Sequence, residues 1–446
     1  MKMKLRVHIP LALITTYFAL FFFVFSDLGI SMMFAYVAMG FVLIVSVVFS
    51  QRVYYSNISI AFFLLALVAV FCFLMPYSRH EFDVLAVILS ILLCSLLALF
   101  SRPTNKEINS ILRIITIVST LLSIYMIIIA IFPNIYIDHI SDFIDEMPRT
   151  NTIRMLRLKY GVMIGGNVTL TNQILVLSML IIINKYLIYD YKEGRLKAVL
   201  MILLGLSAIF LANRKGELLA FVLVVIYTFC FGSSISQNAR FRKAQKYFFL
   251  GAILLTILII VAVRMGLANR YLRFLFYFTT NDRAEMSSGR FELWSTGLRL
   301  FAEHPLIGIG WGNTKYHIDM FNTANQTYIE NVHCLVIQLL AETGLIGCIL
   351  YMTPVVYIFR KMKKTVNYLR SVYTTDMLPQ LLASVALEYQ MFLLINGMID
   401  STWHRISFWP FYAVSIIMAC VAQRMAYSHD SISEPGEIRA RKERSL

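Results

Sequence analysis

Three positions in this sequence carry side chains suited to acid–base and anion-binding chemistry, and they lie far apart along the chain. Arg214 stands in "FLANRKGELLAF", Arg290 in "SGRFELW", and His333 in "NVHCLVIQLLAETGLIG". A guanidinium is planar, permanently charged and able to bind phosphate oxygens in pairs, whereas an imidazole can accept a proton near neutral pH. Together they suit a reaction in which a hydroxyl is deprotonated while an anionic group leaves.

Each of these positions also has a plainer interpretation. Arg214 could snorkel, together with Lys215, from a tight turn between two apolar runs. Arg290 follows two serines and a glycine at the start of a predicted helix, where free backbone N–H groups favour anions, but it could equally be a solvated surface residue. His333 could be an interfacial histidine that moves no proton.

The segment after His333 is apolar apart from Glu342. At about 100° per residue, the two side chains would point to opposite faces of one helix, so Glu342 is expected to brace the fold, through an arginine elsewhere, and not to assist the imidazole. Gly344 and Gly347 are expected to allow close helix packing.

The elements that would position these residues are membrane helices. The chain has 446 residues, of which 59% are hydrophobic, and its mean hydropathy is +0.71. Apolar runs long enough to cross a bilayer recur along nearly all of it, without the ten-residue alternation of a transmembrane β-barrel. The predicted fold class is an all-α, polytopic membrane protein with about twelve transmembrane helices.

The predicted spans follow the apolar runs, and the first is a retained helix, because no small-residue cleavage site follows it. They are about 9–25, 28–50, 58–75, 83–100, 110–132, 168–189, 197–212, 217–233, 247–264, 333–359, 377–398 and 405–424.

Lys and Arg gather in the segments that share a side with the N-terminus, which predicts that both termini are cytoplasmic. On the opposite side Arg predominates, and the only lysines are Lys159, Lys215 and Lys315. An Arg-biased outer face suits recognition of an anionic group, although the positive-inside rule and chance could also produce it.

The predicted organisation alternates membrane blocks with two outer loops. The longer loop exceeds the length of a simple connector and is expected to form one or two short surface helices, with Leu293, Leu298 and Phe301 on one apolar side. The blocks are 1–132 (helices 1–5), 133–167 (periplasmic loop), 168–264 (helices 6–9), 265–332 (large, helical periplasmic loop), 333–424 (helices 10–12) and 425–446 (disordered cytoplasmic tail).

The six cysteines show no metal-ligand spacing, and no outer carboxylate cluster suggests a metal site, so neither a metal nor a cofactor is expected. No nucleic-acid partner is expected either.

Two long stretches resemble a known family. "GRFELWSTGLRLFAEHPLIGIGWGN", followed by "HCLVIQLLAETGLIG", resembles the signature of the O-antigen ligase/polymerase family. His333, Gly344 and Gly347 keep the spacing of the ligase branch, with Cys334 at the second position. "LANRKGE" is similar to the family's "SRG" turn between two membrane helices, and "YGVMIGGNVTLTNQILVL" to its segment after the second outer loop.

This resemblance implies a GT-C-like glycosyltransferase in a bacterial inner membrane, with its active site on the periplasmic side. The implied donor is a glycan on undecaprenyl diphosphate, the acceptor is the lipid A core, and transfer is metal-independent and inverting. The matching motifs carry over His333 as general base and Arg214 and Arg290 as diphosphate-binding residues. Arg154, Arg157 and Lys215 are possible substrate contacts.

Two alternatives remain open at this point. A polymerase would share the donor and topology but would extend another lipid-linked repeat unit; the His-to-Gly spacing favours the ligase. A lipid-linked sugar transporter or flippase would disperse its polar groups over different depths of the membrane, whereas a transferase would gather Arg214, Arg290 and His333 in one outward cavity.

Overall fold

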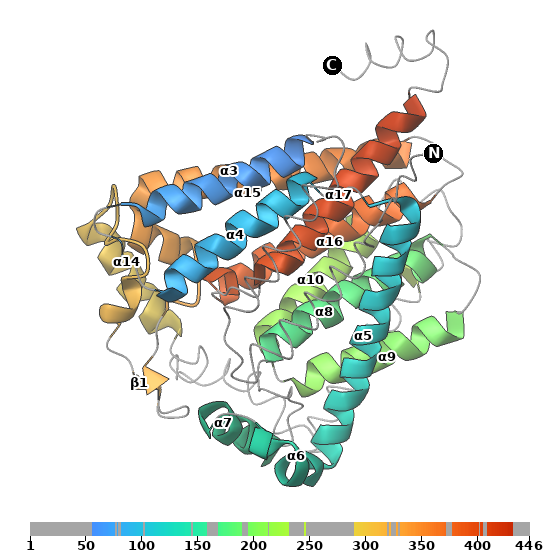
Figure 1. Cartoon of the computed structure of the whole chain (residues 1–446), viewed down its shortest axis with the longest axis horizontal. Helices are drawn as coiled ribbons and strands as arrows, with labels where there is room; N and C mark the ends of the chain where they lie inside the picture. Colours follow the sequence, from blue (N-terminus) through green and yellow to red (C-terminus); the bar gives the residue numbers. More distant parts are fainter. Residues whose placement is uncertain are drawn as a thin grey trace, which may run out of the picture.

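The computed structural model describes the chain as a set of helices packed side by side (Figure 1). The predicted spans at 9–25, 28–50 and 247–264 lie outside the described residues. The described residues are 56–75, 78, 82–100, 103–143, 146–157, 168–189, 195–212, 214–231, 245–246, 290–318, 321–322, 327–328, 331–371, 377–400, 402–404 and 408–430.

The helices coincide to within a few residues with the remaining predicted spans, except that α15 and α17 continue beyond them, α17 past residue 425, where the tail was predicted to begin. A pair of two-residue antiparallel strands, β1 and β2, lies before α15. The elements are α3 Asn57–Phe73, α4 Phe82–Phe100, α5 Asn105–Ile131, α6 Pro133–His139, η1 Ser141–Phe143, α7 Glu146–Arg157, α8 Val168–Ile182, the π-helix η2 Ile183–Ile188, α9 Arg195–Leu211, α10 Lys215–Phe231, α14 Arg290–Glu303, η4 Thr314–Tyr316, β1 Phe321–Asn322, β2 Thr327–Tyr328, α15 Leu335–Ser371, α16 Leu378–Ile399, η5 Thr402–His404 and α17 Phe408–Asp430.

Within the described residues, five helical segments are long and apolar enough to cross a membrane: α5, α8 with η2, α15, α16 and α17. The shorter apolar helices α3, α4, α9 and α10 accompany them. The chain is therefore a predominantly helical membrane protein, while the count of twelve spans stays a prediction.

Local sequence explains where several helices begin. The hydroxyl of Ser56 caps α3, accepting from the Ser59 backbone N–H at 3.3 Å, and Ser59 reciprocates at the Ser56 N–H. Thr104 and Glu107 make the same reciprocal cap at α5. Such caps satisfy backbone donors that the first helical turn leaves unpaired.

An aromatic cluster near η5 ties α15, α16 and α17 together. The Trp403 ring lies 4.9 Å from Phe408 and 5.5 Å from Trp409 of α17, and 6.4 Å from Tyr351 of α15. The Trp403 indole N–H donates to the Leu393 carbonyl of α16 at 3.3 Å. Because these rings are buried, the end of α16 is held firmly where Asp400 follows it.

Polar side chains inside the bundle are paired across helices. The Asn172 amide of α8 donates to the Glu217 carboxylate of α10, and the Asn184 amide of η2 donates to the Glu388 carboxylate of α16 at 2.5 Å. Burial of such groups is costly without partners. The first pair fixes the start of α10, and therefore the position of Arg214 just before it.

Candidate active site

His333 and Asp400 meet although 67 positions separate them in the chain. The imidazole Nδ1 lies 3.0 Å from an Asp400 carboxylate oxygen. The His333 side chain is 30% exposed and that of Asp400 only 11%. A carboxylate that accepts a hydrogen bond from Nδ1–H leaves Nε2 as a proton acceptor, so Asp400 can set the tautomer that a general base requires.

The backbone of His333 is unusual. Its φ is +55°, which makes it the only non-glycine residue with positive φ in the described part of the chain. Its backbone N–H donates to the Asn331 side-chain oxygen at 3.3 Å, and the neighbouring Val332 is fully buried. Such a conformation costs on the order of 1–3 kcal/mol and persists where surrounding packing enforces it. The packing around Val332 and His333 therefore fixes the direction of the imidazole.

Arg290 opens α14 and belongs to the same charged group. Burial lowers the pKa of the Arg290 guanidinium, the nearby Asp400 carboxylate raises it in part, and the positive charge of Arg214 lowers it further. The Arg290 guanidinium is therefore influenced by the charges of both Asp400 and Arg214, and the attraction to Asp400 is the larger of these two effects. We call Arg214, Arg290, His333 and Asp400 the charged cluster.

Close helix contacts, which glycines permit, bring the cluster together. A Cβ at Gly216, two residues after Arg214, would lie 2.7 Å from a methyl carbon of Ile399, the residue before Asp400. A Cβ at Gly297 of α14 would lie 2.7 Å from Ile337 and 3.0 Å from Val332, which flank His333. The backbones of α10, α14, α15 and α16 therefore approach closely around these side chains.

A second arrangement lies beside the cluster and involves the segment 305–310 and a break in α15. Gly344 has φ +64° and ψ −168° inside that helix, so the local helical hydrogen bonds are lost. The groups that would pair Leu345 with Ala341 and Ile346 with Glu342 bond to the loop instead. These bonds are Leu345 N to Pro305 O (2.8 Å), Ile346 N to Leu306 O (3.2 Å), Ile309 N to Ala341 O (2.9 Å) and Gly310 N to Glu342 O (2.9 Å).

We call this inserted loop and broken helix the glycine clasp. A Cβ at Gly344 would lie 2.3 Å from the Leu306 carbonyl, and one at Gly308 would lie 2.4 Å from the Glu342 carbonyl carbon. Gly344 thus permits a contact between backbones, whereas the sequence had suggested ordinary helix packing. The clasp joins the loop after α14 rigidly to α15.

Glu342 braces the clasp as predicted, although through neutral donors. Its buried carboxylate oxygen Oε1 accepts from the Thr314 hydroxyl at 2.5 Å and from the Gln338 amide at 3.2 Å. Within the described residues its partners are thus a hydroxyl and an amide in place of the expected arginine, and they link η4 to α15.

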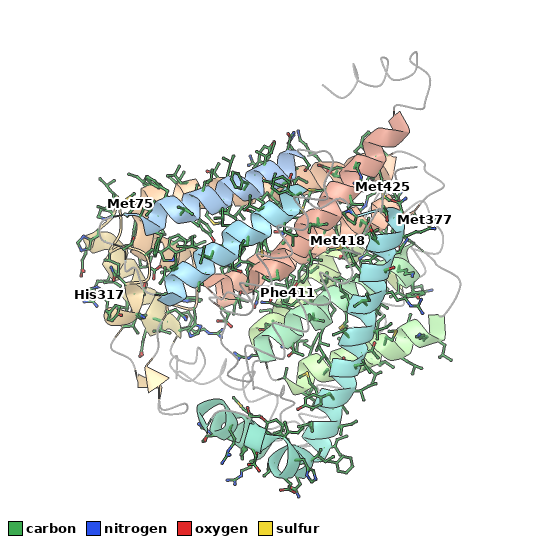
Figure 2. All side chains as sticks on the ribbon, viewed as in Figure 1. Met75, His317, Met377, Phe411, Met418 and Met425 are labelled. Atoms are coloured by element: carbon green, nitrogen blue, oxygen red, sulfur yellow. The ribbon has the colours of Figure 1, made fainter. Side chains whose placement is uncertain are left out.

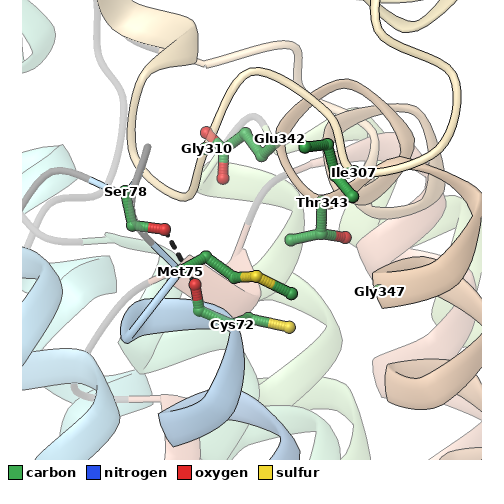
Figure 3. A pocket seen from close by; sticks show the side chains of 8 residues that line it. All are labelled: Cys72, Met75, Ser78, Ile307, Gly310, Glu342, Thr343 and Gly347. Atoms are coloured by element: carbon green, nitrogen blue, oxygen red, sulfur yellow. Dashed lines mark hydrogen bonds between the residues drawn. The ribbon is translucent and has the colours of Figure 1, made fainter.

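A small cavity adjoins the clasp and lies apart from the charged cluster (Figure 3). It measures about 70 Å³, room for water but not for a sugar. Ser78 closes one side: its hydroxyl donates to the Cys72 carbonyl at 2.8 Å and accepts from the Trp311 N–H at 3.2 Å. The lining residues are Cys72, Met75, Ser78, Ile307, Gly310, Glu342, Thr343 and Gly347.

The other predicted contact residues fall elsewhere. Arg154 and Arg157 are exposed on α7, which lies well away from α14 in Figure 1. They do not join the charged cluster. The side chain of Lys215 lies outside the described part of the structure.

The apolar side of α14 differs from the predicted one. Leu293, Gly297 and Leu300 face inward, whereas Leu298 is exposed. Five residues separate Leu293 from Leu298, which places them about 140° apart on a helix. The glycine at 297 was overlooked because it offers close approach and not hydrophobic surface.

Asp400 was not predicted from the sequence as a site residue. It stands in "NGMIDSTW", where a carboxylate ends an apolar helix and two polar residues follow. A charge at the end of a span is a signal of function, but nothing local distinguished its partner.

The fold and the cluster together define a helical membrane protein with one imidazole–carboxylate pair and two guanidinium groups at one end of the bundle. Residues 200–352 match the family model described as O-antigen ligase, and this match supports membership of the O-antigen ligase/polymerase family. No curated protein matches the sequence.

Proposed function

We propose that the protein is an O-antigen ligase that transfers a glycan from undecaprenyl diphosphate to the lipid A core at the periplasmic face of a bacterial inner membrane. The observation that carries the proposal is the 3.0 Å contact between His333 and Asp400 beside two guanidinium groups. Both termini would then be cytoplasmic, with 133–167 and 265–332 as periplasmic loops.

The charged cluster suits a single displacement at the anomeric carbon. His333 Nε2 removes the proton of the acceptor hydroxyl as its oxygen attacks, and Asp400 stabilises the resulting imidazolium. The bond between the anomeric carbon and the diphosphate oxygen breaks, and its electron pair goes to the diphosphate. Arg214 and Arg290 stabilise that leaving charge, so the chain's own residues supply the charge and the base. A single displacement inverts the anomeric configuration.

A position at one end of the bundle supports a transferase over a transporter. His317, in the loop after α14, and Met425, near the end of α17, lie at opposite ends of the molecule (Figure 2). The cluster lies at the α14 end, and its members gather there without spreading through the span. A transporter would place such groups at the midplane.

The test is transfer in vitro by the purified full chain with a lipid-diphosphate glycan and two competing acceptors, a lipid A core and a lipid-linked repeat unit. Product on the core supports the ligase; product on the repeat unit alone shows the polymerase. Without product on either acceptor from well-folded protein, the transferase proposal fails.

His333→Ala is expected to lower kcat by about a thousandfold, because no other described group holds the position of the base. His304→Ala is the matched control, because His304 is an exposed histidine in the same region and outside the cluster. Near-normal turnover of a folded His333→Ala protein would remove His333 as the base.

A further inference from the structure

The turn 305–308 presents large apolar side chains outside the helical core. Leu306 is 62% exposed and Ile307 is 45% exposed, although both lie in the loop that follows a polar helix end at Glu303 and His304. Exposed aliphatic side chains that adjoin one another mark contact with an apolar partner.

The clasp places this turn against the exposed face of a membrane helix. Leu345 and Ile346, whose backbone N–H groups bind the turn, are both exposed on α15. The same exposed face continues through Ile349, Leu350 and Val356. The turn and α15 therefore form one continuous apolar surface.

The depth of the turn can be judged along α15. Arg360 is the first charged residue after Glu342, and it marks the far boundary of the apolar stretch. At about 1.5 Å per residue, Ile346 lies roughly 21 Å from Arg360 along the helix. The hydrocarbon core of a bilayer is about 30 Å thick. The level of Ile346, and of the turn bonded to it, falls within the apolar layer.

Part of the backbone of the turn is paired, which suits surroundings where unpaired polar groups are costly. Pro305 has no N–H, and the carbonyls of Pro305 and Leu306 accept from α15. The N–H groups of Gly308 and Ile309 donate to His304 and Ala341 carbonyls at 3.0 and 2.9 Å.

We propose that the turn 305–308 inserts among the lipid acyl chains of the leaflet nearer the charged cluster. Lipid hydrocarbon is the partner, because the turn extends the face that α15 already exposes as a candidate span. The insertion fixes the depth of α14, and with it of Arg290, relative to the membrane surface. The proposal does not depend on which reaction the cluster performs.

The test replaces Leu306 with the photocrosslinking residue p-benzoylphenylalanine in the full chain, embedded in nanodiscs of a single phosphatidylethanolamine–phosphatidylglycerol mixture. Ile349 on α15 serves as the lipid-facing reference. Glu303, exposed three residues before Leu306, serves as the polar control. After irradiation, mass spectrometry measures the yield of lipid adducts at each position.

The expected lipid-adduct yield at position 306 is within twofold of that at position 349, and at least fivefold above that at position 303. The same crosslinker at Ile307 gives a second reading if the first variant is not recovered folded. A yield at both turn positions equal to that at 303 overturns the proposal. So does a crosslink to a second copy of the chain, seen as a dimer on a denaturing gel.

Discussion

The charged cluster and the glycine clasp both draw on residues 290–346, yet they use opposite means. The cluster joins four polar side chains from segments far apart in sequence, and it keeps His333 partly open to its surroundings. The clasp joins two backbones through four hydrogen bonds and closely opposed glycines. The cluster supplies reactive side chains, whereas the clasp only holds two backbone segments in position.

A single sequence motif can therefore hold two kinds of residue, reactive side chains and glycines that allow backbones to meet. Substitutions in the cluster should lower turnover and leave the fold stable. Substitutions in the clasp should lower stability first, and should affect turnover through the position of α14. Substitutions in each region test that separation.

Of the four substitutions considered next, Arg290→Ala is expected to have the largest effect, a loss of about 10²–10³ in kcat, because a guanidinium at the leaving group no longer stabilises the developing charge. Arg299→Ala, at an exposed position on the same helix, is the control and should stay within about twofold. Steady-state transfer rates and the melting temperature are measured together. If Arg290→Ala lowers Tm in proportion to its rate loss, Arg290 has a structural role instead.

Gly344→Ala is expected to destabilise the protein by about 3 kcal/mol, because its backbone conformation is essentially restricted to glycine and its Cβ would overlap the Leu306 carbonyl. Thermal unfolding in detergent measures the change. Gly205→Ala is the control, since the Cβ there would meet only the flexible end of Met179. Equal melting temperatures for the two variants would show that the clasp is unimportant for stability.

Asp400→Asn is expected to lower kcat by about ten- to a hundredfold, because an amide can hold His333 in the wrong tautomer and cannot stabilise its cation. Tm should change little, as the shape is kept. Asp142→Asn, at an exposed position, is the control. Unchanged turnover in Asp400→Asn would show that Asp400 takes no part in the reaction.

Thr314→Val is expected to have the smallest effect, a loss of about 1 kcal/mol in stability, because the buried Glu342 carboxylate loses a hydroxyl donor. Thr353→Val removes a hydroxyl that bonds only to its own helix at an exposed position and should change nothing measurable. Thermal unfolding of both variants makes the comparison. If Thr314→Val lowered turnover more than stability, Glu342 would contribute to the reaction and not only to the clasp.

The helical elements of this protein were largely predictable. Uninterrupted apolar runs such as the one now seen in α5 identify membrane helices because a bilayer demands length and low polarity. The break at Gly344 was not predictable, because a glycine pair in an apolar run is equally typical of packed straight helices. Leu298 was assigned to the wrong side for a related reason: Gly297 marks the contact face without contributing apolar area.

The candidate site was predictable in part. His333, Arg290 and Arg214 could be named because charged or titratable groups at the edges of apolar segments are costly and carry a recognisable spacing. Arg154 and Arg157 looked equally suitable, since sequence shows the charge of a residue but not its distance from another. Asp400 had no local pattern that linked it to an imidazole 67 positions away.

Hydrophobic length and side-chain chemistry are local properties. The order of the amino acids was therefore enough to identify a helical membrane protein and the residue types that could handle a proton and an anion. The folded arrangement was needed to show that Asp400 pairs with His333, that two arginines lie beside this pair, and that the glycines form a clasp. Those results depend on contacts between distant segments, whose distances no local pattern records.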